Sequence, residues 1–485
     1  MKAIKYLLAG AMFLTVGTSA MAQTAEEKST IDAVAQIISS KPEDVEKAIK
    51  PYFKKNKKNP VVLTGFANAF YEAKDYNNAI VYVDKAIAID PNHTAAYILK
   101  GDIYVMLDNG GEAAKWYEQA IYFSPKDPIG YYKYANIYRG KNPSLAVSKL
   151  ADLRVQRPDL AVDALAGRIY YSSNDLTNAI KYYDKVSDLS KMEPQDIKNF
   201  STACYLKGKL QKSAEVANFG LKSTPRDAGL NRLVFYNNTD LKNYSTAITY
   251  AEKLFNASDS AKFSYLDYIY YGHAFMGLKN YDAAIEKFEL ALQQELNDKD
   301  QKAGIYQQLS DAYNMKNNVE KAVEYYNKFM QTKSKVYPSD YAGLAQIYTV
   351  EAQSQTDPAK QTEYFNKAFE LYNNLTTADN EENIRVYGLL QQGRIKASLD
   401  PETTEGLAKP YYDGVISILE PKATLEDSDK SKLIEAYRYC GYYFFSKADY
   451  ETSKTLFEKV ITLDPQNEQV LTALEGINEM LSKKK

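Results

Sequence analysis

The sequence predicts an all-α protein made of consecutive helix pairs, and three observations support that prediction. Prolines close successive segments at Pro91 and Pro125, which lie 34 residues apart. Ala79 and Ala113 recur at the same interval, within segments whose apolar residues follow a helical spacing. Similar segments then return along most of the chain. A long fixed period indicates a repeat architecture in which each unit packs mainly on its neighbours.

Residues 1–22 are predicted to form a signal peptide. Lys2 and Lys5 precede an apolar run from Tyr6 to Val16, and Ala20-Met21-Ala22 supplies small residues at the two positions that a signal peptidase reads. The apolar run is shorter than the about 20 residues that span a bilayer. Cleavage is therefore expected before Gln23.

We therefore expect an exported protein, periplasmic or otherwise outside the cytoplasm, with no membrane insertion after cleavage. The first cysteine of the chain is Cys204, so the cysteine that carries the lipid of a bacterial lipoprotein is absent from the expected cleavage site. Cys204 and Cys440 lie far apart within helical patterns, and we interpret both as small buried apolar residues instead of a disulfide.

The repeated residues have a consistent spacing within each unit. The first helix carries a small residue, Ala67 in one unit and Gly101 in the next, where the second helix is expected to cross closely. The second helix carries its own alanine, Ala79 or Ala113, with a larger side chain one turn later, and a proline ends the unit. A 34-residue unit with these residues resembles the tetratricopeptide repeat.

The resemblance implies an α-α superhelical solenoid of about ten to eleven helix pairs with capping helices at its ends. In this family the first helix of each unit, helix A, lines a concave groove that usually holds an extended peptide or a partner helix. Helix B forms the opposite face.

The units are predicted in chain order. Two shorter amphipathic helices within residues 25–56 and a final helix from about Glu468 to Leu481 are expected to cap the two ends. The chain is therefore divided into residues 1–22 as signal peptide, 23–58 as N-terminal capping helices, 59–350 as the solenoid, 351–465 as degenerate units with insertions, and 466–485 as the C-terminal capping helix. The clearest marker residues are Gly167, Tyr170, Ala179 and Tyr183 in the fourth unit, Gly272, Ala284, Phe288 and Ala291 in the seventh, and Tyr437, Gly441 and Phe457 in the last.

Nothing in the sequence predicts a catalytic or metal site. The two histidines, His93 and His273, belong to distant units, and the chain carries none of the usual phosphate-binding, zinc-binding or acyl-transfer motifs. We therefore expect no enzyme activity, no cofactor and no metal. The formal net charge of −2, or −4 without Lys2 and Lys5, argues against nucleic acid as a partner.

The polar and aromatic residues of helix A are the candidates for partner binding, because the resemblance places them in the groove. Amides, rings and charges of this kind suit hydrogen bonding to a peptide and stacking on its side chains. The densest cluster is in the second to fourth units, where Arg139 and Arg168 are expected to face solvent and could hold a carboxylate. The candidates are Asn68, Tyr71, Asp102, Tyr132, Asn136, Arg139, Arg168, Tyr171, His273, Asp311 and Asn314.

The leading hypothesis is therefore an exported scaffold that binds a protein or peptide partner in the cell envelope. The alternative is a periplasmic or surface glycan- or nutrient-binding protein built on similar helix pairs, which the 43 tyrosines would suit through sugar stacking. The family's clamp for chaperone C-termini is not supported, because only Asn68 matches it and Lys133 keeps no more than the charge.

Export gives the first testable prediction. Mass spectrometry of protein recovered from the periplasm should find Gln23 at the N-terminus, because the small residues of Ala20-Met21-Ala22 direct the cut there. Recovery of that protein with Met1 still in place would contradict the prediction.

Overall fold

The computed structural model describes residues 23–483, and its regular elements there are all helices, from α2 to α26. Residues 1–22, with the predicted signal peptide, lie outside the described residues, as do residues 484–485. Within residues 23–483, no helix combines the length and the apolar character that crossing a membrane requires. The predicted all-α fold is confirmed.

The chain divides into two compact parts, an N-terminal part that ends at Ala261 and a C-terminal part that begins at Lys262. The N-terminal part contains α2 (Ala25–Ser39), α3 (Val45–Asn56), α4 (Pro60–Glu72), α5 (Tyr76–Ile89), α6 (Thr94–Met106), α7 (Gly110–Phe123), α8 (Pro128–Tyr138), α9 (Pro143–Gln156), α10 (Val162–Ser172), α11 (Leu176–Tyr183), α12 (Pro194–Leu206), α13 (Leu210–Leu221), α14 (Ala228–Asp240) and α15 (Tyr244–Ala257).

The C-terminal part contains α16 (Tyr265–Gly277), α17 (Tyr281–Leu292), α18 (Lys299–Met315), α19 (Val319–Thr332), α20 (Pro338–Ser354), α21 (Pro358–Tyr372), α22 (Glu382–Leu399), α23 (Lys409–Leu419), α24 (Asp427–Ser446), α25 (Tyr450–Leu463) and α26 (Glu468–Lys483). Short 3-10 helices add residues Leu189–Lys191 and Asn373–Leu375.

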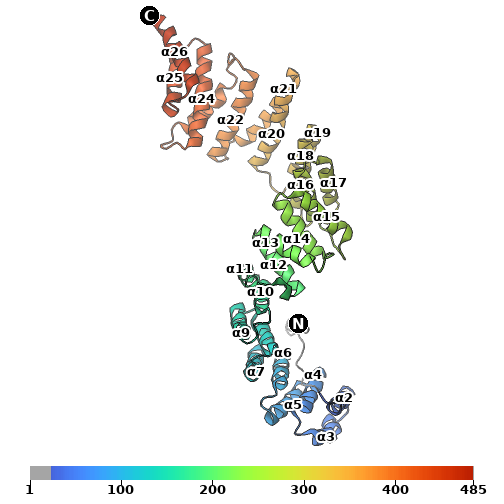
Figure 1. Ribbon diagram of the computed structural model, residues 1–485. Coiled ribbons are helices and arrows are strands. Elements are labelled where there is room, and N and C mark those ends of the chain that lie inside the picture. Colours follow the sequence, from blue (N-terminus) through green and yellow to red (C-terminus); the bar gives the residue numbers. More distant parts are fainter. Residues whose placement is uncertain (1–22, 484–485) are drawn as a thin grey trace. The chain divides into compact units, whose positions relative to one another are not determined.

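The helices from α4 to α25 form consecutive pairs, in which the even-numbered helix is helix A and the odd-numbered one is helix B. Each helix A packs on helix B of its own pair, and within each part each helix B packs on the next helix A. The pairs therefore follow one another in chain order along each part (Figure 1). The two helices expected within residues 25–56 are α2 and α3, and α2 packs on α4.

A glycine under an aromatic ring makes the closest contact between the two helices of several pairs. A Cβ added at Gly101 would lie only 2.3 Å from the ring of Tyr117, and one added at Gly272 would lie 2.3 Å from the ring of Phe288. No side chain fits at such a distance, so the glycine allows helix B to cross close to helix A. The same contact joins Gly167 to Tyr183 and Gly441 to Phe457.

The turn inside several pairs uses a left-handed residue followed by a side-chain cap. Lys74 has φ 64° and Asp108 has φ 57°, a conformation that costs about 1–2 kcal/mol for residues other than glycine. Asp75 and Asn109 follow these residues, and each side chain accepts a hydrogen bond from the first turn of helix B. Capping of this kind contributes about 0.5–2 kcal/mol, which offsets the strained residue before it.

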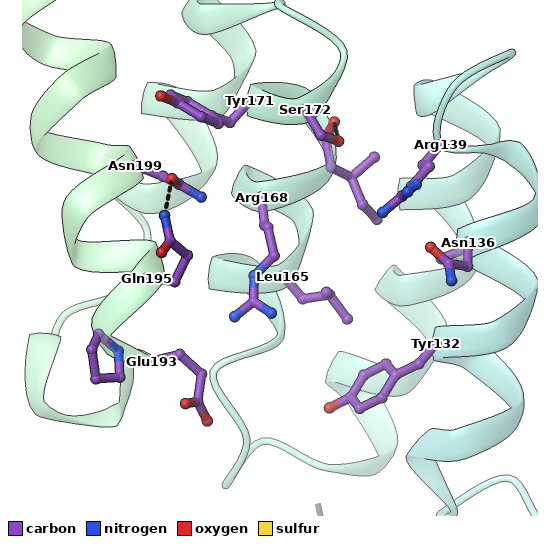
Figure 2. A pocket seen from close by; sticks show the side chains of 13 residues that line it. Tyr132, Asn136, Arg139, Leu165, Arg168, Tyr171, Ser172, Glu193, Gln195 and Asn199 are labelled. Atoms are coloured by element: carbon purple, nitrogen blue, oxygen red, sulfur yellow. Dashed lines mark hydrogen bonds between the residues drawn. The ribbon is translucent and has the colours of Figure 1, made fainter. Parts of the chain in front are cut away.

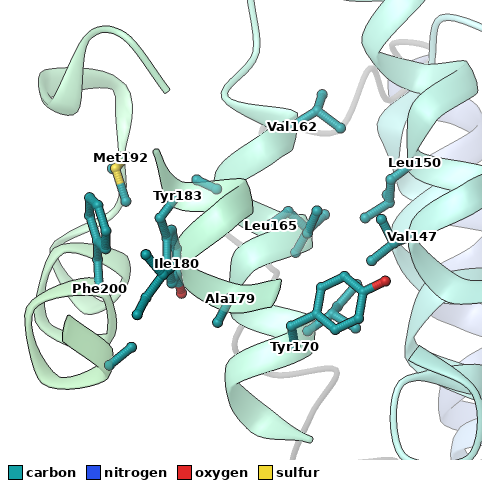
Figure 3. Packing of buried hydrophobic residues seen from close by; sticks show 14 of the residues in the cluster. Val147, Leu150, Val162, Leu165, Tyr170, Ala179, Ile180, Tyr183, Met192 and Phe200 are labelled. Carbon is teal, nitrogen blue, oxygen red and sulfur yellow. The ribbon is translucent and has the colours of Figure 1, made fainter. Parts of the chain in front are cut away.

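One continuous apolar core lies beneath helices α8 to α13. Tyr183 and Phe200 stack with ring centroids 5.2 Å apart, and Ala179 is fully buried beside them. Figure 3 shows these residues together with Val147 and Leu165 in one cluster. This core fixes the positions of α8, α10 and α12, and the outer faces of α8 and α10 carry five of the eleven predicted groove residues.

Both cysteines are free and buried, as their positions in the sequence predicted. Burial raises the pKa of the Cys204 thiol to about 11 and the pKa of the Cys440 thiol to about 12. Both thiols therefore stay protonated and unreactive at neutral pH.

The close crossing predicts the effect of a larger residue at Ala284. Its side chain is fully buried in α17, so leucine should overpack the contact and lower the free energy of unfolding by about 1–3 kcal/mol. Chemical denaturation would measure the loss, and Ala88→Leu at an exposed position of α5 provides the control. Equal stability of the two variants would show that the assigned crossing is wrong.

Candidate functional site

A pocket of about 600 Å³ lies on the helix-A surface of the N-terminal part, between α8, α10 and α12. Figure 2 shows side chains from all three helices around it. The lining residues are Tyr132, Ala135, Asn136, Arg139, Leu165, Arg168, Ile169, Tyr171, Ser172, Glu193, Pro194, Gln195 and Asn199. The structure therefore brings together five of the candidates named from the sequence: Tyr132, Asn136, Arg139, Arg168 and Tyr171.

Helix α8 supplies one wall of the pocket. The helix begins after Asp127, whose side chain caps it, and Pro128 holds its first position. Helical spacing then places Tyr132, Asn136 and Arg139 on the pocket side, while Tyr131 is buried beneath them. The wall is therefore an aromatic ring, an amide and a guanidinium in a row.

Arg139 is half-buried at the C-terminal end of α8 and has no carboxylate partner among residues 23–483. Burial lowers the pKa of the Arg139 guanidinium, and no neighbouring charge contributes to that shift. The group nevertheless keeps its charge at neutral pH. The pocket thus has an unbalanced positive charge at one end.

Arg168 behaves differently, and the prediction that it faces solvent is wrong. Its guanidinium makes two hydrogen bonds, of 2.7 and 2.5 Å, to the carboxylate of Asp196 on α12. The Arg168 side chain is only 20% exposed and that of Asp196 only 2%. The hydroxyl of Tyr183 donates to the same carboxylate at 3.3 Å. Arg168 therefore joins α10 to α12, and its removal would leave a buried carboxylate without its cation.

In other pairs too, the residue that directly follows the small crossing residue of helix A bonds a side chain of the next helix A. In the second pair, Lys133 bonds Asp102 at 2.7 Å, and the Tyr117 hydroxyl donates to Asp102 at 2.6 Å. In a later pair, Arg394 binds Glu435. Side chains at this position therefore face the next helix A, which explains why Arg168 is not open to solvent.

A second ring, Tyr171, and an apolar floor complete the pocket. Tyr132 and Tyr171 are partly buried against the core, and Leu165 and Ile169 lie in it. On the far wall, the Gln195 amide donates to Asn199 Oδ1 at 2.8 Å. The pocket thus combines rings and aliphatic carbon with amides that suit a polypeptide backbone.

The remaining candidates of the N-terminal part lie outside this pocket. Asn68 is exposed on α4, and Tyr71 is partly buried on the same helix. Burial, with a smaller effect of the Asp102 carboxylate, raises the pKa of the Tyr71 hydroxyl to about 12. Asp102 is held by Lys133 and Tyr117, so its charge is already compensated.

The candidates of the C-terminal part form a separate group. His273 Nε2 lies 2.7 Å from Gln308 Oε1 of α18, so this side chain also bridges successive helices A. Asn314 is partly buried on α18. Asp311 is exposed as a whole residue, but its carboxylate is partly shielded from water. This burial raises the pKa of the Asp311 carboxyl to about 6.

The sequence analysis missed the wall that α12 supplies. Glu193, Gln195 and Asn199 line the pocket, but the fifth unit has few of the repeated residues. The sequence feature that could have located α12 was Ser201, which lies 34 residues after Gly167 and is a small, fully buried residue. Taking Ser201 as the crossing residue would have placed α12 in register with α10.

The site offers groups that suit binding. Within residues 23–483, no group of three or more His, Cys, Asp or Glu side chains is arranged to hold a metal ion. The groups of the pocket suit recognition through charge-assisted hydrogen bonding at Arg139, amide hydrogen bonding and contact with rings.

Comparisons with known proteins agree with this architecture. Two sequence models of the tetratricopeptide repeat match the chain, one over residues 47–137 and the other over residues 164–191, 303–335 and 441–467. A tetratricopeptide repeat-containing protein of Methanocaldococcus jannaschii is 22% identical over 454 residues, which cover 90% of this chain and 70% of that protein.

Solved structures resemble parts of the chain. The C-terminal part of a tetratricopeptide repeat-containing protein from Cytophaga hutchinsonii is 23% identical, with a TM-score of 0.45, and the match covers 57% of this chain and 99% of that one. A tetratricopeptide repeat protein from Parabacteroides merdae is 18% identical, with a TM-score of 0.31, over 52% of this chain and 97% of that one. The repeat matches lie in both parts of the chain and support an assignment to the tetratricopeptide repeat family.

Proposed function

We propose that this protein is an exported scaffold that binds protein partners through the concave helix-A groove of its N-terminal part. Tetratricopeptide repeat proteins generally bind protein or peptide partners and are generally non-catalytic scaffolds. The pocket between α8, α10 and α12 is the observation that carries the proposal. Its groups match an extended polypeptide, which offers backbone amides and side chains at regular intervals.

The size and lining of the pocket support a short segment as the occupant. A pocket of about 600 Å³ lies within the about 300–1,000 Å³ range of small-ligand sites, so it takes a few side chains and not a folded domain. Tyr132 and Tyr171 give rigid contact area, and their ordering on binding costs little conformational entropy. The rest of the partner would lie along neighbouring helices A.

An exported location forms part of the proposal. It is supported by the charge, apolar run and small residues of the first 22 positions, which together are typical of a signal peptide. Cleavage before Gln23 would leave the start of α2 intact, because Thr24 and Glu27 form its capping box. The mature chain would thus keep its first helix and the packing of α2 on α4.

The glycan-binding alternative has less support, because packing accounts for many of the tyrosines. Tyr117, Tyr131, Tyr183 and Tyr372 are among the largest fully buried side chains, where no sugar can reach them. The tyrosine content that suggested stacking on sugars is therefore in part a property of the core.

Site-specific photo-cross-linking tests the proposed binding surface. A photoreactive benzoylphenylalanine replaces Tyr171, which lines the pocket, or Lys181, which is exposed on helix B of the same pair. Illumination of expressing cells should yield polypeptide adducts from position 171, because the photoreactive ring would touch the bound partner. Protease digestion of an adduct identifies whether it is a polypeptide.

Position 181 serves as the matched control, since it carries the same probe on the opposite side of the pair. Adducts from position 181 alone would place binding on the helix-B face and overturn the groove proposal. Binding to a glycan array without any polypeptide adduct would favour the alternative.

A further inference from the structure

We infer that the pocket between α8, α10 and α12 receives the side-chain carboxylate of an acidic residue within an extended polypeptide segment. Arg139 would hold the carboxylate, and Asn136 would accept a backbone N–H of the same segment. This inference rests on the proposed function, because it presupposes that the groove holds a polypeptide. It adds the chemistry that the bound segment must carry.

Arg139 stands apart from other arginines of the N-terminal part because it lacks a carboxylate partner. Arg154 bonds Asp163 at 2.6 Å, and Arg168 binds Asp196 as described above. Arg157 and Arg226 are likewise paired with aspartates. Arg139 has no such partner within residues 23–483, although it is half-buried in the wall of a pocket.

A half-buried guanidinium without a partner is energetically unfavourable in the free protein, and this favours the binding of a carboxylate. Burial takes water away from the charge, and the lowered pKa of the Arg139 guanidinium reflects that loss. The negative end of the α8 dipole lies at the C-terminus of the helix and offsets part of the loss, because it favours a cation there. A carboxylate from a partner would replace the missing hydrogen bonds with two short charge-assisted ones.

Asn136 gives the second, independent observation. Its Oδ1 atom is buried and accepts no hydrogen bond from the part of the chain that the structure describes. Buried polar atoms in native proteins are nearly always satisfied, so this acceptor lacks a donor in the free protein, and the amide would turn toward the pocket to meet one on binding. Asn136 and Arg139 are one helical turn apart, so an acceptor and a cation lie side by side. A peptide N–H next to a carboxylate matches that pair.

The other charges of the pocket do not compete for this role. Arg168 is already bound to Asp196, and Glu193 influences the pKa of Arg168 and of Tyr132 but not that of Arg139. One unpaired positive charge therefore remains, which favours one carboxylate over a more highly charged group such as a phosphate cluster.

An acidic residue within a chain fits better than a chain end, because the helix-A surface continues on both sides of the pocket. Lys133 of α8 is joined to Asp102 of α6, and α12 packs on α14. An extended segment can therefore pass through the pocket and remain in contact with helices A in both directions. A terminal carboxylate would use only one of these directions.

The test pans the immobilised mature protein against two libraries of random peptides. In the first, the C-terminus of each peptide is fused to the carrier, so side chains supply every carboxylate; in the second, the C-terminus is free. The wild-type protein should enrich aspartate or glutamate in the fused library. Arg139→Gln should lose that enrichment, and Arg139→Lys should keep part of it because it keeps the charge. Arg154→Gln, outside the pocket, should behave as wild type.

A single enriched peptide then measures how much the acidic side chain contributes to binding, and this comparison uses only the wild-type protein. Changing its acidic residue to the amide should weaken binding to the wild-type protein more than tenfold, or about 1.4 kcal/mol. Arg139→Gln should bind the acidic peptide and its amide equally. Unchanged melting of Arg139→Gln would show that its fold is intact.

The outcomes separate the inference from the function beneath it. Retention of peptides without acidic enrichment, or acidic enrichment that survives Arg139→Gln, overturns the inference and leaves the proposed function standing. Retention confined to the library with free C-termini overturns it in favour of a terminal carboxylate. Failure of the wild-type protein to retain any peptide from either library counts against both proposals.

Discussion

Close crossing of the two helices in a pair is the constraint on which the rest of this structure depends. Gly101, Gly167, Gly272 and Gly441 each lie beneath an aromatic ring of helix B, at distances that exclude any added Cβ. In the first pair, Ala67 takes the place of the glycine and Val83 takes the place of the ring, at the same sequence separation, and both are fully buried. The larger residue on helix A is therefore accompanied by a smaller one on helix B. Packing at core density makes such pairs interdependent, because little free volume remains to absorb a methyl group.

The same contact positions the functional surface. Tyr183 lies over Gly167, and its hydroxyl reaches the Asp196 carboxylate that holds Arg168. The buried ring, the ion pair and the wall of the pocket are therefore one connected unit that sets α10 against α12. Tyr117 with Asp102 and Lys133, and Tyr412 with Glu435 and Arg394, repeat that unit elsewhere. A charged side chain on the helix-A surface thus often forms an ion pair with the next helix A. A charged side chain without such an ion pair, as at Arg139, is the one available to a partner.

The repeat period predicted the helix pairs because small residues and rings recur wherever the helices cross, as Ala79, Ala113 and Phe288 do. It also predicted the α8 and α10 walls of the pocket, since helical spacing places Tyr132, Asn136 and Tyr171 on one surface. It did not predict the fate of Arg168, whose partner Asp196 belongs to a unit where Ser201 replaces the glycine and few repeated residues remain. Nor did it distinguish Arg139 from Arg168. Pairing depends on which side chains of the next helix face them, and a local pattern does not contain that information.

A thermodynamic cycle on the seventh pair tests the constraint most directly. Gly272→Ala alone should lower the free energy of unfolding by about 1–3 kcal/mol, because its Cβ meets the ring of Phe288. Phe288→Val alone should also be costly, since it leaves a cavity in a fully buried site. The double variant reproduces the Ala67 and Val83 combination, so its loss should be smaller than the sum of the two single losses by about 1 kcal/mol or more. Simple additivity of the two losses in chemical denaturation would contradict the claim that this crossing sets the geometry of the pairs.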